Sequence, residues 1–230
     1  MSKSHLSLAL ILFIIAAQPH VAQARQFVPT SQENSRTGIG FSIKYTMGTH
    51  NGLAEKLTGS ASITDQDELR AAQFVVPIAS MKTGNNQRDC HLREALGIEY
   101  VGSIFPKHHV CDDNNQLPAT GANSLRHPNI VFNFQSYTKK PAVPLRVGEL
   151  QTVLVSGTIQ IHGVTRQISN LPVQLLMNKS SGKTTIRLIS KMVIVLSDFG
   201  IIVKPFKVFV ASISVAKQAS VSLDILLIEK

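Results

Sequence analysis

Hydrophobic side chains recur at every second position in about nine separate segments of this sequence. In residues 39–47, for example, the sequence IGFSIKYTM places a large apolar side chain at every odd position. The same period recurs in residues 57–63, 74–78, 130–134, 153–161, 173–177, 186–194, 209–215 and 221–227. Because successive side chains of a strand point to opposite faces of the sheet, this period indicates half-buried antiparallel strands. We therefore predict an all-β chain of about eight or nine strands.

The segments between these runs predict turns, one long loop and a single helix. His162-Gly163 separates two alternating runs and predicts a tight hairpin, and the segment Ser180–Lys183 predicts another. Residues 105–129 are rich in Pro, Asn and Asp, which indicates a long surface excursion. Only residues 88–96 have the pattern of a short helix. No internal repeat and no linker divides the chain, so we predict one domain.

An antiparallel sheet of this size leaves exposed edges unless it closes on itself. The pattern alone is compatible with an up-and-down β-barrel or with a β-sandwich. A barrel of about eight strands encloses an interior that side chains fill or that holds one small ligand. A filled core and a hollow interior both produce a period of two, so the pattern cannot separate them. From the residues alone, we favour a filled core.

The N-terminus has the organisation of a secretory signal peptide. Lys3 supplies a positive start, residues 6–17 form an apolar run of 12 residues, and Ala22-Gln23-Ala24 is an A-x-A cleavage site. The run is too short for a membrane anchor, since a spanning helix needs about 20 apolar residues. We predict that residues 1–24 are removed and that residues 25–230 form the exported protein.

Cys90 and Cys111 are the only two cysteines, and both lie in the mature chain. Export places them in an oxidising compartment, so we expect them to form a disulfide. Closing that loop stabilises the chain by about 3 kcal/mol in the chain-entropy model. The alternative is a redox-active pair, which usually has C-x-x-C spacing, and this spacing is absent.

The composition excludes several classes of protein and leaves the role of the positive charge open. With 43% hydrophobic and 16% charged residues, the chain is too apolar to be intrinsically disordered. The net charge of +9 indicates either a solvated barrel exterior or attraction to an anionic membrane surface. A chain without Trp and with three Tyr lacks an aromatic stacking surface for nucleic acid, so we expect no nucleic-acid partner. The loosely clustered basic residues are Lys139, Lys140, Arg146, Lys183, Arg187, Lys191, Lys204 and Lys207.

Strings that resemble catalytic or metal motifs lack the rest of their motif sets. Asp198-Phe199-Gly200 copies the D-F-G of protein kinases, but no glycine-rich loop, V-A-I-K or H-R-D accompanies it. Ser180–Lys183 fits S-x-x-K and Lys82–Gly84 fits K-T-G, but their order is the reverse of that in penicillin-interacting enzymes. The histidines have no H-E-x-x-H or compact ligand spacing. We predict no catalytic residue and no metal site.

Three motifs in one order carry a resemblance to a known family. They are Ser80-Met81-Lys82-Thr83-Gly84 leading into Arg88-Asp89-Cys90-His91-Leu92, then Gly157-Thr158-Ile159-Gln160-Ile161-His162-Gly163-Val164-Thr165-Arg166, then Asp198-Phe199-Gly200-Ile201. In this order and spacing the chain resembles the YceI family of polyisoprenoid-binding, lipocalin-like proteins, over residues 36–228. There are departures: residues 107–127 look like an insertion, the segment 51–59 replaces the usual G-x-F-x-x-F-x-G hairpin, and Leu196-Ser197 replaces a basic residue before D-F-G.

The resemblance implies an extended antiparallel barrel with a long apolar tunnel. It also implies that the tunnel binds a polyisoprenoid chain or a quinone tail, usually in the bacterial periplasm. On this basis we expect a periplasmic protein that carries or stores an isoprenoid lipid, with a role in stress response as one option and no other cofactor. The alternatives are a lipid-modifying enzyme that uses His162 or His91 as an acid or base, and a filled-core structural or stress protein.

The expected tunnel lining consists of large inward-facing apolar residues. Phenylalanine and methionine suit an irregular alkyl guest because Phe offers a broad apolar face and Met adapts its shape. His162 is expected to hold its turn by hydrogen bonds or to contact a ligand headgroup. The candidate lining residues are Phe41, Ile43, Phe132, Phe134, Ile159, Ile161, Leu175, Leu188, Met192, Phe209 and Ile213.

Overall fold

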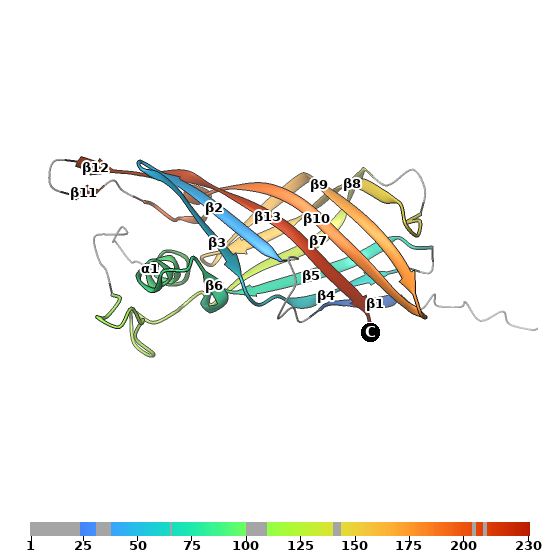
Figure 1. The fold of residues 1–230 in the computed structure, drawn as a ribbon, viewed down its shortest axis with the longest axis horizontal. Coiled ribbons are helices and arrows are strands. Elements are labelled where there is room, and N and C mark those ends of the chain that lie inside the picture. Colours follow the sequence, from blue (N-terminus) through green and yellow to red (C-terminus); the bar gives the residue numbers. More distant parts are fainter. Residues whose placement is uncertain are drawn as a thin grey trace, which may run out of the picture.

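The computed structural model describes residues 24–30, 38–64, 66–99, 110–139, 144–203, 206–208 and 211–230 (Figure 1). Residues 1–23 of the expected signal peptide lie outside this range, so that expectation stays a prediction. The described strands are β1 (Arg25–Pro29), β2 (Ile39–Tyr45), β3 (Gly48–Ala54), β4 (Thr58–Ile63), β5 (Leu69–Pro77), β6 (Met81–Lys82), β7 (Asn129–Lys139), β8 (Leu150–Ile161), β9 (Val164–Ser180), β10 (Lys183–Val195), β11 (Phe206–Val208), β12 (Ala211–Ile213) and β13 (Val215–Glu229). The helical elements are η1 (Ile78–Ser80), α1 (Asn86–Gly97) and η2 (Leu196–Phe199). Within these residues, no helix has the length and apolarity that crossing a bilayer demands.

Eight strands close into an antiparallel barrel in the order β1-β4-β5-β7-β8-β9-β10-β13. The barrel closes where Phe27 of β1 pairs with Glu229 of β13. Farther along β13, residues 215–223 pair with β2 instead, and β2 continues the sheet into β3 and β6. The predicted all-β barrel with one short helix is therefore confirmed, and the sandwich alternative is wrong.

The alternating pattern places one set of side chains inside the barrel. In β8, every second residue from Val153 to Ile161 is buried, whereas the residues between these positions are more exposed. The barrel is elongated because β8, β9, β10 and β13 are long strands with extensive pairing (Figure 1). The helix α1 lies beside one end of this barrel (Figure 1).

Both predicted hairpins are confirmed, and their backbones explain the turn residues. His162 and Gly163 both have positive φ, at 52° and 73°, as do Ser181 and Gly182, at 50° and 76°. Two positive φ values in a two-residue connection are typical of the type I′ turn, whose twist matches that of the flanking strands. The expected helix is present and slightly longer, with the Asn85 side chain accepting a hydrogen bond from the Arg88 amide at 2.9 Å.

The predicted disulfide between Cys90 and Cys111 is present and ties the surface excursion to α1. The described part of that excursion, residues 110–128, contains no helix or strand. Glu94, which is fully buried in α1, accepts hydrogen bonds from the backbone amides of Val110 and Cys111. A covalent bond and a buried carboxylate thus hold the same point of the loop.

The strand expected over residues 209–215 is wrong. Residues 211–213 form β12, which pairs with β11 in a separate two-stranded sheet, and β13 begins only at Val215. Figure 1 shows β11 and β12 projecting beyond the barrel at the end where α1 lies. Phe209, proposed as a lining residue, lies outside the described residues, and Ile213 belongs to this separate hairpin.

Four described strands were not predicted: β6 and β11 have only two and three residues, and the longer β1 and β3 each have a physical reason. The sequence of β1, RQFVP, is short and contains one fully buried side chain, Phe27. The sequence of β3, GTHNGLA, lacks large apolar side chains at alternate positions. Backbone pairing stabilises both strands: β1 pairs with β4 and β13, and β3 pairs with β2. Their own sequences have only a weak strand pattern.

Candidate functional site

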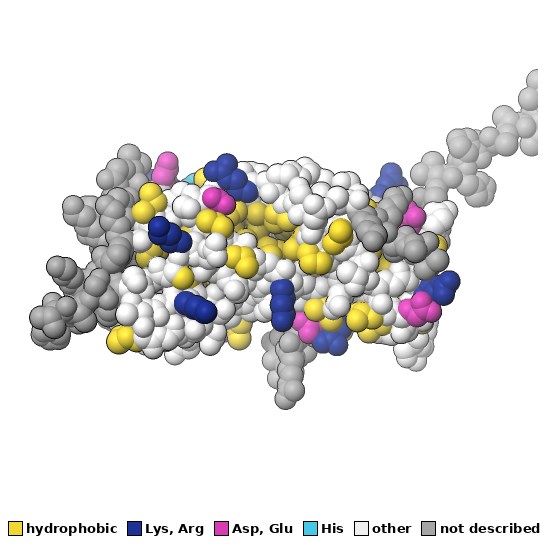
Figure 2. Space-filling view, turned by 90° about the horizontal axis from the view of Figure 1, so that it is seen from above, with side chains coloured by type: hydrophobic (Ala, Val, Ile, Leu, Met, Phe, Trp, Pro, Cys, Tyr) yellow, Lys and Arg dark blue, Asp and Glu magenta, His cyan; other side chains and the backbone are white. Residues whose placement is uncertain are grey.

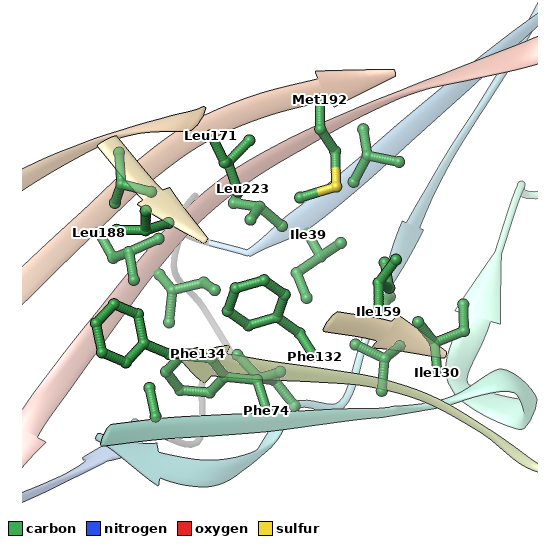
Figure 3. A pocket seen from close by; sticks show the side chains of 18 of the residues that line it. Ile39, Phe74, Ile130, Phe132, Phe134, Ile159, Leu171, Leu188, Met192 and Leu223 are labelled. Atoms are coloured by element: carbon green, nitrogen blue, oxygen red, sulfur yellow. The ribbon is translucent and has the colours of Figure 1, made fainter. Parts of the chain in front are cut away.

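The interior of the barrel contains an apolar cavity of about 140 Å³ (Figure 3). All 25 residues that line it have apolar side chains, so no described lining residue carries a titratable or hydrogen-bonding group. Cavities of similar size lined by Leu, Ile and Phe stay dry and accept apolar guests. Such a lining favours an apolar guest over water or charge.

Eight of the eleven expected lining residues are placed at this cavity. They are Phe41, Phe132, Phe134, Ile159, Ile161, Leu175, Leu188 and Met192. Ile43, in β2, packs as a half-buried side chain against the core cluster near α1 and is not among the lining residues. Phe209 and the side chain of Ile213 lie outside the described residues. Contact of the eight with a ligand stays a prediction.

The cavity also has lining residues that were not chosen from the sequence. Ile39, Phe74 and Leu223 lie in alternating runs, but alternation cannot separate a cavity wall from a filled core. Ala72 and Leu171 had weaker signals, because Ala is small and Leu171 stands beside a proline outside the recognised run. A prediction that included every inward-facing residue of each strand would have covered these lining residues.

Inward-facing side chains in the middle of the barrel remain only partly covered by other protein atoms. Phe132, Phe134, Leu188 and Met192 point into the cavity in Figure 3, yet each is only half-buried. Side chains toward the two ends are more completely buried, such as Met177 at 0% exposure and Phe199 at 3%. The hollow therefore lies along the middle of the barrel, between two packed ends.

His162 holds the end of the barrel beside α1 by two contacts with backbone oxygens. Its Nε2 atom lies 2.7 Å from the Ile98 carbonyl oxygen, and its Nδ1 atom lies 3.1 Å from the Phe199 carbonyl oxygen. These contacts join the β8–β9 hairpin to the end of α1 and to η2. His162 is not among the cavity lining residues, so its geometry favours the turn-holding role over contact with a buried ligand.

His127 packs against the same hairpin. Its ring lies edge-on to that of His162, with 5.2 Å between ring centroids, and the space above Gly163 is filled by the His127 ring. Partial burial lowers the pKa of His127 below its ordinary value, and the nearby His162 lowers it further, while Glu99 opposes the shift. His127 therefore makes a structural contact with the hairpin, and the charge of His127 depends on pH.

One group of potential metal ligands exists among the described residues, but the disulfide occupies it. The ligand atoms of His91, Glu94 and Cys111 lie within 4.8 Å of one another. The sulfur of Cys111 is bonded to Cys90, and the carboxylate of Glu94 accepts two backbone hydrogen bonds. A disulfide sulfur is not the thiolate that metals bind. This group therefore anchors the loop.

The expected basic cluster is partly neutralised where it can be described. Arg187 forms a bidentate ion pair with Asp224, with N–O distances of 2.7 and 2.6 Å, which raises the pKa of Arg187. Arg146 pairs with Glu149 at 3.5 Å, and Lys191 is exposed. Lys140 and Lys204 lie outside the described residues. Attraction to an anionic membrane stays a prediction.

Comparison with known proteins gives one family and several similar folds. The model of the YceI-like domain matches residues 31–101 and 112–227. A solved structure of a polyisoprenoid-binding domain from Saccharophagus degradans, implicated in plant cell wall breakdown, is 15% identical and superposes with a TM-score of 0.55. That alignment covers 90% of this chain and 99% of the other. No curated protein sequence matches the chain significantly.

Two further solved structures align over most of their length. BcnA from Burkholderia cenocepacia is 12% identical, with coverage of 83% of this chain and 96% of that one and a TM-score of 0.49. A YceI protein from Campylobacter jejuni is 16% identical, with coverage of 78% and 84% and a TM-score of 0.47. At such identities, the likeness to the Saccharophagus domain supports the fold alone.

Proposed function

Because the chain belongs to the YceI-like domain family, we propose that it binds an isoprenoid lipid, either a polyisoprenoid or an isoprenoid quinone, in its barrel. The observation that carries this proposal is the cavity of about 140 Å³ whose 25 lining residues are all apolar. The filled-core alternative does not account for such a cavity, which exceeds the room that a few waters need.

Hydrocarbon is the chemistry that this lining recognises. Each buried methylene group contributes about 0.8 kcal/mol, whereas a polar group without a partner costs about 1–3 kcal/mol. Much of this gain is offset by the cost of ordering the flexible chain. The net gain is reduced further because the lipid leaves the bilayer interior, which is also apolar. The protein therefore gains selectivity from the length and shape of the cavity rather than from raw affinity.

A long prenyl chain requires the lining to adjust, because the cavity of about 140 Å³ leaves little room for such a chain. Phe132, Phe134 and Met192 lie at the cavity with part of their surface uncovered (Figure 3). These side chains can move aside as the ligand enters, since Met has three rotatable bonds and no neighbour fully encloses the two rings. The occupied barrel would then be wider than the empty one.

The proposed role is carriage or storage without covalent chemistry. None of the described lining residues has a nucleophile, acid or base within the cavity. The enzyme alternative named His162 or His91 as its acid or base, and neither lines the cavity. Both ring nitrogens of His162 are directed at backbone carbonyls. Export to the periplasm and a part in stress response belong to the same proposal and rest on the N-terminal sequence and the family.

Native mass spectrometry of freshly purified protein, followed by delipidation and uptake of a prenyl quinone from vesicles, tests the binding. A cavity-filling variant, Leu188→Phe, should lower uptake about tenfold, equivalent to ~1.4 kcal/mol. Leu150→Phe is the matched control, because Leu150 is 53% exposed and outside the cavity lining. A delipidated wild type that takes up neither a prenyl quinone nor a polyprenol would overturn the proposal.

A further inference from the structure

The pairing between β9 and β10 stops partway along both strands. The ladder runs from Lys183↔Ser180 to Ser190↔Val173. Beyond that point, residues 191–195 of β10 pair only with β13, and residues 164–172 of β9 pair only with β8. The barrel wall therefore lacks backbone pairing between these two segments, which we call the β9–β10 window.

Two residues of β9 explain why the ladder ends here. Pro172 is the first residue past the last paired position, and it has no amide hydrogen to donate to a neighbouring strand. Asn170 has a φ of +56°, and the register of β9 against β8 shifts by one residue at this position. Such a bulge bends its strand, so β9 leaves β10 while it continues to pair with β8.

Side-chain hydrogen bonds fasten both ends of the window. At one end, the buried Ser190 hydroxyl donates to the Pro172 carbonyl oxygen at 2.7 Å. At the other end, Arg166 Nε of β9 donates to the Asp198 carbonyl oxygen of η2 at 2.6 Å. These contacts keep the two strands attached while the residues between them stay apart.

The window leads into the apolar cavity. Leu171 of β9 and Met192 of β10 both line the cavity, and Figure 3 shows both on its upper side. Viewed from above, the molecule has a hollow with hydrophobic side chains on its floor (Figure 2). Continuing the register of the ladder would place Met192 opposite Leu171, so these two side chains stand where the missing pairing would have been.

The ends of the barrel offer no comparable route through the described residues. Phe27, Met177 and Leu227 fill the end near the C-terminus, with exposures of 0–1%. At the other end, Ile78 of η1 packs in one core cluster with Leu96 of α1 and Phe199 of η2, and all three are buried. None of these six residues lines the cavity. A ligand that enters along the barrel axis would have to displace a packed core.

We propose that the β9–β10 window is the entrance through which the hydrocarbon chain passes sideways into the cavity, with Met192 as its gate. This inference rests on the proposed function, since it concerns how the same cavity is filled. Met192 suits the role because its flexible side chain can swing aside without displacing a strand. A lateral entrance also lets the lipid chain enter sideways along its length, so that it does not have to pass through an end of the barrel.

The polar end of such a lipid stays at the mouth of the window. The cavity offers it no hydrogen-bond partner, so burying it would cost free energy. Outside, Lys191 is exposed on β10, and the backbone groups of residues 191–195 that face the window have no ladder partner in β9. The mouth therefore suits a headgroup that carries hydrogen-bond acceptors.

A crosslink across the window tests this proposal. Ser169→Cys and Val193→Cys place thiols at two exposed positions on opposite sides of it, and a short bis-maleimide can join them. The matched control is Asn178→Cys with Thr185→Cys, which are direct partners where the ladder is continuous and lie outside the lining. Each protein is first loaded with a ubiquinone carrying a two-isoprene tail, then crosslinked and mixed with excess phosphatidylcholine vesicles.

The crosslink across the window should slow quinone release at least tenfold, while the control crosslink should change it less than twofold. Equal release from both crosslinked proteins would overturn the window and leave the proposed function intact, because the proteins were loaded. Failure of the uncrosslinked proteins and the wild type to load would overturn both. Met192→Trp, which narrows the entrance without a crosslink, should slow uptake in stopped-flow measurements; an unchanged rate would count against the gate.

Discussion

The Nε2 atom of His162 lies 2.7 Å from the carbonyl oxygen of Ile98, the residue that follows the last turn of α1. The Nδ1 atom of the same ring lies 3.1 Å from the Phe199 carbonyl oxygen. Carbonyl oxygens only accept hydrogen bonds, so a neutral ring with one N–H can satisfy one of these contacts at a time. One side chain in a hairpin thus connects β8–β9, α1 and η2.

Replacing His162 by Asn should destabilise this end of the barrel. Asn tolerates the positive φ of 52° but is too short to bridge both carbonyls. We expect the free energy of unfolding to fall by about 1–3 kcal/mol, the cost of leaving buried polar groups unpaired. Urea denaturation measures this loss. Ser181→Asn at the other hairpin is the control, since Ser181 has a φ of 50° and is exposed; equal effects of the two substitutions would contradict the bridging role.

The pH dependence of stability should contain a contribution from His127. Its pKa is lowered in the folded protein by partial burial, then by His162, so the unfolded chain binds the proton more readily. Folding stability should therefore be fully present above about pH 6.5, the ordinary value, and should fall as the pH drops below it. The His127→Gln variant should show a flatter decline in thermal melts between pH 7 and pH 5. A decline identical to that of the wild type would rule this contribution out.

Truncating Phe132 should change which chain lengths the barrel prefers. Phe132→Ala enlarges the cavity, because the ring lines it and points into it (Figure 3). Each additional methylene that the larger cavity accommodates should raise affinity by about fourfold, from ~0.8 kcal/mol per group. Competition between prenyl quinones of increasing tail length measures the shift. Val193→Ala, on an exposed side chain outside the lining, should leave the preference as in the wild type.

The inner face of the barrel could be predicted from the sequence because a strand pattern depends only on neighbouring residues. Phe41, Phe132 and Met192 were identified in this way, and the turns at His162-Gly163 and Ser181-Gly182 follow from local backbone preference. Ile43 shows the limit of the method. It shares a strand face with Phe41 and packs against the same core cluster, yet only Phe41 lines the cavity, because the position along the barrel axis decides which inward side chains meet the hollow.

Features that depend on pairing between distant strands were beyond sequence reasoning. The β9–β10 window arises from Asn170 and Pro172, but the sequence does not say which neighbour β9 loses there. The strand expected over residues 209–215 had the correct alternation, and only the separate pairing of β11 with β12 shows that part of it lies outside the barrel. The contacts of His162 with Ile98 and Phe199 join residues 64 and 37 positions apart, which no local motif encodes.

Removing the disulfide should release the loop from α1 and lower stability. Cys90 and Cys111 are separated by 21 positions, so the chain-entropy model gives a stabilisation of about 3 kcal/mol. The Cys90→Ala/Cys111→Ala double variant should lose about this amount in urea denaturation, and titration of the wild type should find almost no free thiol. Glu94→Gln should show part of the loss even with the disulfide intact, because the buried carboxylate also holds the amides of Val110 and Cys111. If Glu94→Gln were as stable as the wild type, the disulfide alone would hold the loop, and two free thiols in the wild type would show that the bond does not form in the cell.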